Sequence, residues 1–90
     1  MNKRDFTPTM WLRARGLSAR EAQVGLLIAR GYLVKEIAVE LFLAPGTITT
    51  LVSRARVKLE CSSSKEMTIL LLRSGVITPE DLHSHDQTDG

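Results

Sequence analysis

The stretch "VKEIAVELFLAPGTITTLVSRARVKL", residues 34–59, predicts two helices joined by a tight turn. Its first part carries apolar residues at helical spacing. "LAPG" then interrupts the pattern, because Pro45 disfavours helical geometry in the residue before it and is well suited to open a new helix. We therefore expect a helix over about 34–42, a turn, and a longer helix over about 45–59. The residues expected to face inward from the first helix are Val34, Ile37, Ala38 and Leu41.

The longer helix divides into an apolar side and a polar side when it is turned at about 100° per residue. We expect its apolar residues in the core, and these are Ile48, Val52, Ala55 and Leu59. The opposite side carries Thr49, Thr50, Ser53 and Val57, flanked by Arg54 and Arg56. A helix fits the major groove of duplex DNA, so that outward side chains reach base edges and flanking cations meet phosphates. The two sides therefore predict a DNA-recognition helix.

Another helix is predicted before this pair, over about 19–30. Ser18 and Glu21 have the spacing of a reciprocal capping box, and Gly31 is suited to the left-handed conformation that ends a helix. Besides its main apolar stripe this helix has a second one, formed by Ala22, Leu26 and Ala29. We expect the N-terminal segment to cover this second stripe with a short helix. That segment offers Thr7 as a cap, Pro8 at a first helical position, and Trp11 and Leu12 as packing residues.

A further helix is predicted over about 64–74, because Ser63 and Glu66 repeat the capping box and Gly75 can end the helix. Its apolar residues reach almost all the way round: Met67, Ile69, Leu70, Leu71 and Leu72. This is more than one core contact requires, and it favours a partner surface. The alternative is that "TPEDL" forms a turn that brings Leu82 across this helix. The remaining residues, 83–90, have no apolar anchor, and we expect a flexible tail.

Composition points to one small all-α domain. The chain has 90 residues, of which 43% are hydrophobic and 4% aromatic, and no apolar run approaches the roughly 20 residues needed to span a bilayer. Residues 1–79 hold all 12 Lys and Arg but only six of the 10 acids, whereas residues 80–90 hold the other four. A basic body with an acidic tail favours a polyanionic partner, although solubility alone could account for such a charge.

These features together resemble the LuxR-type (GerE-like) helix-turn-helix domain of bacterial transcription regulators, from Leu17 to Met67. The family's Leu-Thr-x-Arg-Glu is matched by Leu17, Ser18, Arg20 and Glu21, and its Leu-Ile-Ala-x-Gly by Leu27, Ile28, Ala29 and Gly31. Its Lys-Glu-Ile-Ala is matched by Lys35, Glu36, Ile37 and Ala38, and its Lys-Leu by Lys58 and Leu59. The resemblance implies a four-helix domain over 17–77, with an N-terminal extension over 1–16 packed on it and a turn and disordered tail over 78–90. An isolated fragment of a longer protein is the alternative, but the short extensions at both ends look more like the natural termini of a stand-alone domain than like cut ends.

The resemblance also implies roles for individual residues. The third helix of the domain enters the major groove, and the fourth commonly forms a dimer. The residues implied to meet base edges are Thr49, Thr50 and Ser53. Those implied to meet phosphates are Lys35, Thr47, Arg54, Arg56 and Lys58. Those implied to lie in the dimer interface are Met67, Leu70, Leu71, Arg73 and Ser74.

Six residues depart from the family pattern. Thr49 replaces a usual Lys or Arg, Leu51 replaces His, and Gly25 replaces an apolar residue. Ala44 stands where Ser caps the third helix, and Leu33–Val34 stands where Ser–Asn often caps the second. Each lost cap costs about 0.5–2 kcal/mol if nothing substitutes. The departures predict weaker autonomous DNA binding but leave the fold unchanged.

The function expected is that of a sequence-specific, DNA-binding transcription regulator. Its expected partners are double-stranded DNA, a second copy of the chain or another regulator, and RNA polymerase. A first alternative is the fourth region of a sigma factor, because "GTITTLVSRARVKL" also looks like that family's Gly-Thr-Val-x-Ser-x-x-x-Arg-Ala-x-x-x-Leu. A second alternative is an interaction module that pairs through residues 65–74 with a longer LuxR-type regulator and modulates it. We expect a cytoplasmic protein, nucleoid-associated when bound to DNA.

No enzymatic activity, cofactor, metal or membrane association is expected. His83, His85 and Asp86 could ligate a metal in principle, but they lie in a polar tail without an apolar frame. Cys61 is the only cysteine and precedes the last helix, where a small buried thiol is more plausible than a reactive one.

Overall fold

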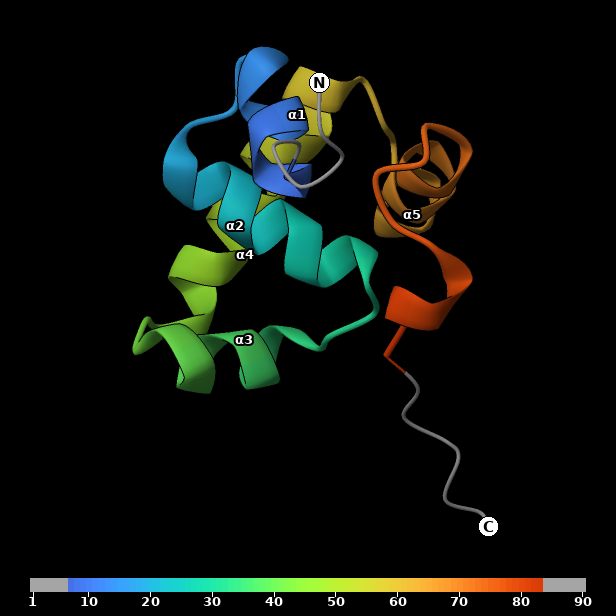
Figure 1. Ribbon diagram of the computed structural model, residues 1–90. Helices are drawn as coiled ribbons and strands as arrows, with labels where there is room; N and C mark the ends of the chain where they lie inside the picture. Colours follow the sequence, from blue (N-terminus) through green and yellow to red (C-terminus); the bar gives the residue numbers. More distant parts are fainter. Residues whose placement is uncertain (1–6, 84–90) are drawn as a thin grey trace, which may run out of the picture.

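The computed structural model describes residues 7–83, and within this range all of the regular secondary structure is helical (Figure 1). Its elements are α1 (Pro8–Ala14), α2 (Ala19–Ala29), α3 (Val34–Leu41), α4 (Pro45–Leu59), α5 (Ser64–Arg73) and the short 3₁₀ helix η2 (Pro79–Asp81). In Figure 1, α2 lies against α4, with α3 beneath them, α1 above and α5 to one side. The predicted all-α class and the expected helix-turn-helix pair are therefore confirmed.

Side-chain caps begin α1 and α2 as the sequence predicts. The Thr7 hydroxyl accepts a hydrogen bond from Met10 N, and Pro8 occupies the first helical position. At the start of α2 the Ser18 hydroxyl accepts from Glu21 N at 3.1 Å, and the Glu21 carboxylate accepts from Ser18 N at 2.9 Å. This reciprocal box satisfies two N–H groups that a helix terminus otherwise leaves without partners.

The cap of α5 differs from its prediction. The Ser63 hydroxyl accepts from Glu66 N as expected, but the Glu66 carboxylate accepts from the backbone and side chain of Ser62 instead of from Ser63. The reason is geometric, because the loop before α5 turns the N–H of Ser62 towards this carboxylate. These hydrogen bonds, the backbone one first, hold the pKa of Glu66 below its ordinary value.

The helix-turn-helix pair itself begins with weakly capped helices. The N-cap positions of α3 and α4 are Leu33 and Ala44, and neither side chain makes a capping hydrogen bond. At α3 the Glu36 carboxylate compensates in part, because it accepts from Leu33 N at 2.8 Å. Helix α3 also ends one residue earlier than predicted, since Phe42 takes the left-handed conformation with φ 57°. The Phe42 side chain is 93% exposed.

The core forms on both faces of α2. On one face Val24 packs with buried residues of the helix-turn-helix pair, which are Ile37, Ala38, Ile48, Leu51 and Val52. On the other face the second apolar stripe of α2 packs beneath Leu12 of α1 and against α5. Helix α1 thus packs against α2 in the same cluster as Ala22, Leu26 and Ala29, and α5 shares in covering them. Trp11 packs at the edge of the same cluster, with the Arg15 guanidinium 4.0 Å above its ring.

Gly25 lies in the contact between α2 and α4. A Cβ atom added there would come within 3.2 Å of the Cβ of Ala55, which is tighter than an ordinary van der Waals contact. Glycine at this position therefore lets the two helices pack closely. A glycine inside a helix also lowers the stability of that helix by roughly 0.5–1 kcal/mol relative to alanine.

The C-terminal segment docks differently from the prediction. Val76 and Ile77 are buried in the core, and "TPEDL" contains η2 with its two cap residues, but Leu82 remains 39% exposed. The chain instead crosses to the loop after α2, where His83 N donates to Arg30 O and the His83 ring stacks on Tyr32. This corrects the expectation that nothing anchors the chain at His83, whereas the rest of the predicted tail, residues 84–90, lies outside the described residues. The start of the predicted extension, residues 1–6, lies outside them too.

Across residues 7–83, no single helix combines the length and apolar character needed to cross a membrane; α3 and α4 would meet that criterion only together, as a pair bent by 110°.

Candidate nucleic-acid interface

Helix α4, the predicted recognition helix, is held in its orientation by its buried side. Five apolar side chains of α4 are buried, namely Ile48, Leu51, Val52, Ala55 and Leu59. They include all four residues predicted to face inward, and they add Leu51, which stands where the family usually has His. Because α2 and α3 hold this side, α4 cannot rotate without exposing the core. The orientation of its other side is therefore set by hydrophobic packing.

The outward side carries the residues predicted to meet base edges. Thr49 and Thr50 are exposed, Ser53 is half-buried, and Val57 is 76% exposed. The structure thus brings the three predicted base-contacting side chains together on one solvent-facing stripe of α4. Thr47 is also exposed, one turn earlier.

Two of these hydroxyls are already bonded to the helix. Thr49 Oγ1 donates to Pro45 O and Thr50 Oγ1 donates to Gly46 O, both at 3.1 Å. This bond to the carbonyl four residues earlier is a common habit of threonine in helices, and it fixes the side-chain rotamer. Sequence spacing alone did not reveal which way the hydroxyl protons point.

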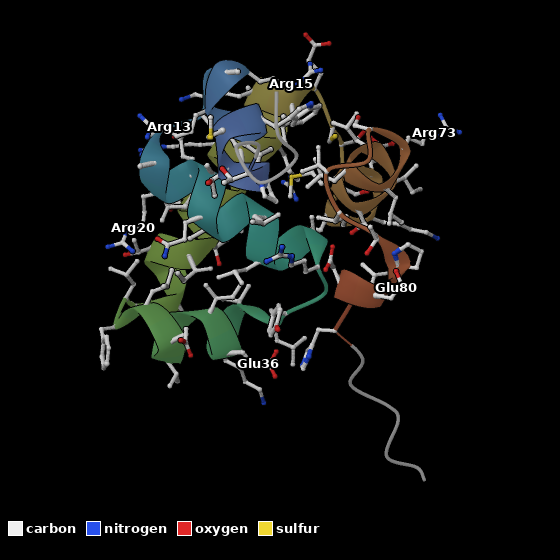
Figure 2. The ribbon with its side chains drawn as sticks, in the orientation of Figure 1. Arg13, Arg15, Arg20, Glu36, Arg73 and Glu80 are labelled. Carbon is white, nitrogen blue, oxygen red and sulfur yellow. The ribbon has the colours of Figure 1, made fainter. Side chains whose placement is uncertain are left out.

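The predicted phosphate-contacting cations are in different environments. Arg54 is exposed and Arg56 half-buried on α4, and Lys35 is exposed on α3. Ser53, Arg54, Val57 and Lys58 line a shallow depression of about 230 Å³ on the surface of α4. Positive charge is also present elsewhere, since Figure 2 shows Arg13, Arg20 and Arg73 at the periphery of the molecule.

Lys58 has a partner that the sequence did not predict. Its ammonium group lies 2.7 Å from Glu21 Oε1, and the Glu21 side chain is only 6% exposed. Hydrogen bonding from Lys58 is the main reason that the pKa of Glu21 lies below its ordinary value, with the Ser18 N–H second and burial opposing both. The ion pair joins the end of α4 to the start of α2 across 37 residues of sequence, a separation that no local pattern signals.

The predicted dimer residues on α5 need one correction. Met67 and Leu71 are fully buried in the core of this protomer, so their side chains cannot form an exposed dimer surface. Leu70 is half-buried, whereas Arg73 and Ser74 are exposed. Ile69, which was not assigned to the interface, is 42% exposed. The apolar residues of α5 are thus divided between the core and the surface.

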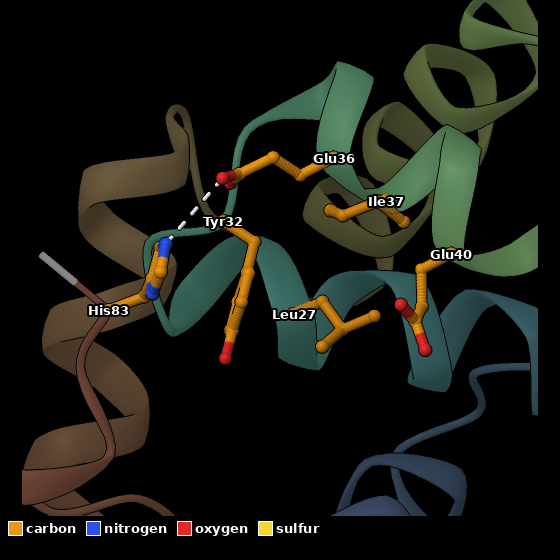
Figure 3. A pocket seen from close by; sticks show the side chains of 6 residues that line it. All are labelled: Leu27, Tyr32, Glu36, Ile37, Glu40 and His83. Carbon is orange, nitrogen blue, oxygen red and sulfur yellow. Dashed lines mark ion pairs between the residues drawn. The ribbon is translucent and has the colours of Figure 1, made fainter. Parts of the chain in front are cut away.

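A separate pocket of about 420 Å³ lies between the end of α2, α3 and the C-terminal segment (Figure 3). Its lining residues are Leu27, Tyr32, Glu36, Ile37, Glu40 and His83. The His83 and Tyr32 rings are stacked at 4.3 Å, and His83 Nε2 lies 3.5 Å from Glu36 Oε2. Within the described range no three His, Cys, Asp or Glu side chains are arranged to hold a metal; His85 and Asp86 fall outside that range.

Cys61 is a half-buried thiol at the start of the loop before α5. Burial, followed by the charge of Glu66, raises its pKa above the ordinary value. A raised pKa lowers the fraction of reactive thiolate. This agrees with the interpretation of Cys61 as a packing residue.

Comparison with known proteins identifies the family. The model described as "Bacterial regulatory proteins, luxR family" matches residues 15–71. The chain belongs to this LuxR family. It therefore carries a LuxR-type helix-turn-helix domain, which is a DNA-binding regulatory domain and not a catalytic one. The family match favours this reading over the fourth region of a sigma factor.

Curated relatives of this LuxR-type domain are response regulators. The chain is 38% identical over 68 residues to Response regulator UvrY of Escherichia coli (strain K12), which covers 76% of the chain and 31% of UvrY. It is also 38% identical over 61 residues to Response regulator GacA of Pseudomonas aeruginosa, which covers 68% of the chain and 28% of GacA. The matches thus span less than a third of each relative. No solved structure matches the chain significantly.

Proposed function

We propose that this LuxR-family protein is a sequence-specific DNA-binding transcription regulator that inserts α4 into the major groove. The observation that carries the proposal is the division of α4 into two sides. Its apolar side is buried against α2 and α3, whereas Thr49 and Thr50 face solvent. A helix held in this way presents short polar side chains to base edges without moving any core residue. UvrY and GacA are both named response regulators, which supports a regulatory role.

Phosphate contacts fall to the groups that flank this stripe. Lys35, Thr47 and Arg54 are exposed, and Arg56 is half-buried, so each side chain is accessible to a DNA backbone. Lys58 contributes differently, because its ammonium group pairs with Glu21 while its side chain remains 39% exposed. We assign Lys58 first to holding α4 against α2 and only second to attracting phosphate.

Protein partners are proposed for the exposed part of α5. Ile69, Leu70, Arg73 and Ser74 offer an apolar centre with a polar edge, which suits a second copy of the chain. A longer LuxR-type regulator with the same helix could replace that copy, and RNA polymerase is a further proposed partner. On this account the protein acts in the cytoplasm and on the nucleoid.

Fluorescence anisotropy with a labelled duplex at two salt concentrations tests DNA binding. We expect log affinity to fall linearly with log salt, and Arg54→Ala or Arg56→Ala to reduce the slope by about one unit each. Arg13→Ala removes the same charge from α1 and serves as the matched control. Unchanged affinity and slope in both α4 variants would refute groove binding.

Sedimentation of the free and DNA-bound protein tests the dimer. We expect two copies per duplex, and Leu70→Glu should leave one copy because it places a charge in the apolar centre of the contact. Met10→Glu, which adds the same charge in place of an exposed apolar residue on α1, is the control. A wild-type protein that stays monomeric on DNA would contradict the proposed self-association.

A further inference from the structure

The hydroxyl protons of Thr49 and Thr50 are not available to DNA in this structure. Each hydroxyl lies 3.1 Å from a backbone carbonyl oxygen, that of Pro45 for Thr49 and that of Gly46 for Thr50. A carbonyl oxygen can only accept a hydrogen bond, so the hydroxyl must be the donor. The single proton of each hydroxyl therefore points back along the helix.

What remains on the outward side of each hydroxyl is an acceptor. A threonine hydroxyl has one proton and two lone pairs, so a hydroxyl that donates to its own helix can only accept from another group. In the major groove the hydrogen-bond donors are the amino groups of adenine and cytosine. Guanine presents only acceptors there, and thymine presents an acceptor and a methyl group. An acceptor atom of guanine would therefore face the acceptor oxygen of the threonine, and no hydrogen bond would form unless the hydroxyl first broke its bond to the backbone carbonyl.

The neighbouring residues supply no cationic donor. Residues 45–53, the first half of α4, contain no Lys or Arg. The usual partner of guanine is a bidentate Arg or Lys, and the nearest one along α4 is Arg54, on the flank of the stripe. Threonine also carries a methyl group, which can contact the thymine methyl. An A·T pair offers both an amino donor and that methyl, whereas a G·C pair offers only the donor.

We infer that the front of α4 selects A·T pairs, read through the adenine amino group by the acceptor oxygens of Thr49 and Thr50, and discriminates against guanine at the same positions. This inference rests on the proposed function, because it names the base chemistry that the recognition helix reads. Thr49 and Thr50 thereby act as specificity-determining residues through the direction of their hydroxyl protons.

Selection from a random-sequence duplex library with the full chain tests the inference. We expect wild-type protein to enrich adenine at positions whose preference weakens in Thr49→Val or Thr50→Val, because valine keeps the shape and loses the acceptor. Thr47→Val is the matched control, and it should alter affinity similarly for all sequences without changing base preference. Thr49→Arg should convert the preference at its position to guanine. Circular dichroism verifies that the variants keep the helical fold.

An atomic substitution in the DNA provides the second arm. The enriched adenine of the selected duplex is replaced by unsubstituted purine, which lacks the amino group. We expect wild-type affinity to fall about three- to tenfold, the size of one hydrogen bond, and the affinity of the matching valine variant to stay unchanged.

Three results would overturn the inference. Guanine enrichment that depends on either threonine hydroxyl would show that the hydroxyl donates its proton to DNA. Equal purine effects in wild type and valine variants would show that the amino group is read elsewhere. Salt-dependent binding without base preference would refute this inference and leave DNA binding intact, whereas absence of binding at low salt would refute the proposed function as well.

Discussion

Glu21 shows how much one residue contributes beyond its sequence motif. Its spacing from Ser18 predicts a capping box, and that prediction is confirmed. The same carboxylate also pairs with Lys58 at 2.7 Å, which ties α2 to the end of the recognition helix. The cap was predictable because its partners lie three residues apart. The ion pair was not, because it depends on how two helices pack.

The ionisation of Glu21 should make stability depend on pH. Its pKa is lower in the folded chain than the ordinary value of 4.5, because Lys58 and Ser18 stabilise the charged form. The resulting stabilisation is fully present above the unfolded pKa and is lost as the pH falls through the folded pKa. Urea unfolding at pH 7 and at lower pH should therefore show a loss of stability on acidification that is smaller in Glu21→Gln. Glu40→Gln, an exposed carboxylate on α3, should leave the loss as in wild type; an unaltered loss in Glu21→Gln would contradict this role.

Gly25 should tolerate only small side chains. A bulky group would have to displace Ala55, whose Cβ lies 3.2 Å from where a Cβ of residue 25 would be. We predict that Gly25→Leu lowers the free energy of unfolding by about 1–3 kcal/mol through overpacking. Gln23→Leu, on the exposed face of α2, is the control and should change it by less than about 0.5 kcal/mol. Urea denaturation measures both, and equal effects would mean that α2 and α4 are not closely packed there.

At the scale of the helices, periodicity and caps predicted most of the fold. Five α-helices were expected, and residues 7–83 contain five, because apolar periodicity together with capping residues, glycine or proline marks most of their boundaries. The face of α5 was harder to predict, since its apolar residues reach almost all round the helix. Only tertiary packing separates Met67 and Leu71, which are buried, from Ile69, which is exposed. Helical periodicity alone could not make that division.

The recognition helix should be improvable at its start. Ala44 is the N-cap of α4, has extended backbone dihedrals and provides no side-chain acceptor. We predict that Ala44→Ser raises the free energy of unfolding by about 0.5–2 kcal/mol, because the hydroxyl can accept from Gly46 N or share the N–H of Thr47, which donates to Ala44 O at 3.0 Å. Thermal or urea unfolding measures the gain, and Ala44→Val provides a control without an acceptor. A serine variant no more stable than the valine variant would show that the cap is already satisfied.

At the scale of the whole molecule, the sequence predicted which side of α4 is exposed better than it predicted which residues of α5 are exposed. The polar stripe on α4 follows from the 3.6-residue periodicity of a single helix. Burial of the apolar side alone therefore sets the orientation of this stripe. The path of the C-terminal segment depends on contacts between distant residues, such as the stacking of His83 on Tyr32. Such contacts leave no periodic signal. The predicted flexible segment therefore proved to be anchored as far as His83.

The most direct test of the central claim is an amide ¹H–¹⁵N NMR titration of the full chain with its selected duplex. The claim is that the polar side of α4 enters the groove while its apolar side stays in the core. We predict that the largest shift changes fall at Thr47, Thr49, Thr50 and Ser53, with Lys35 also affected. Changes confined to other helices, with the amides of residues 47–53 unperturbed at saturating DNA, would contradict the account.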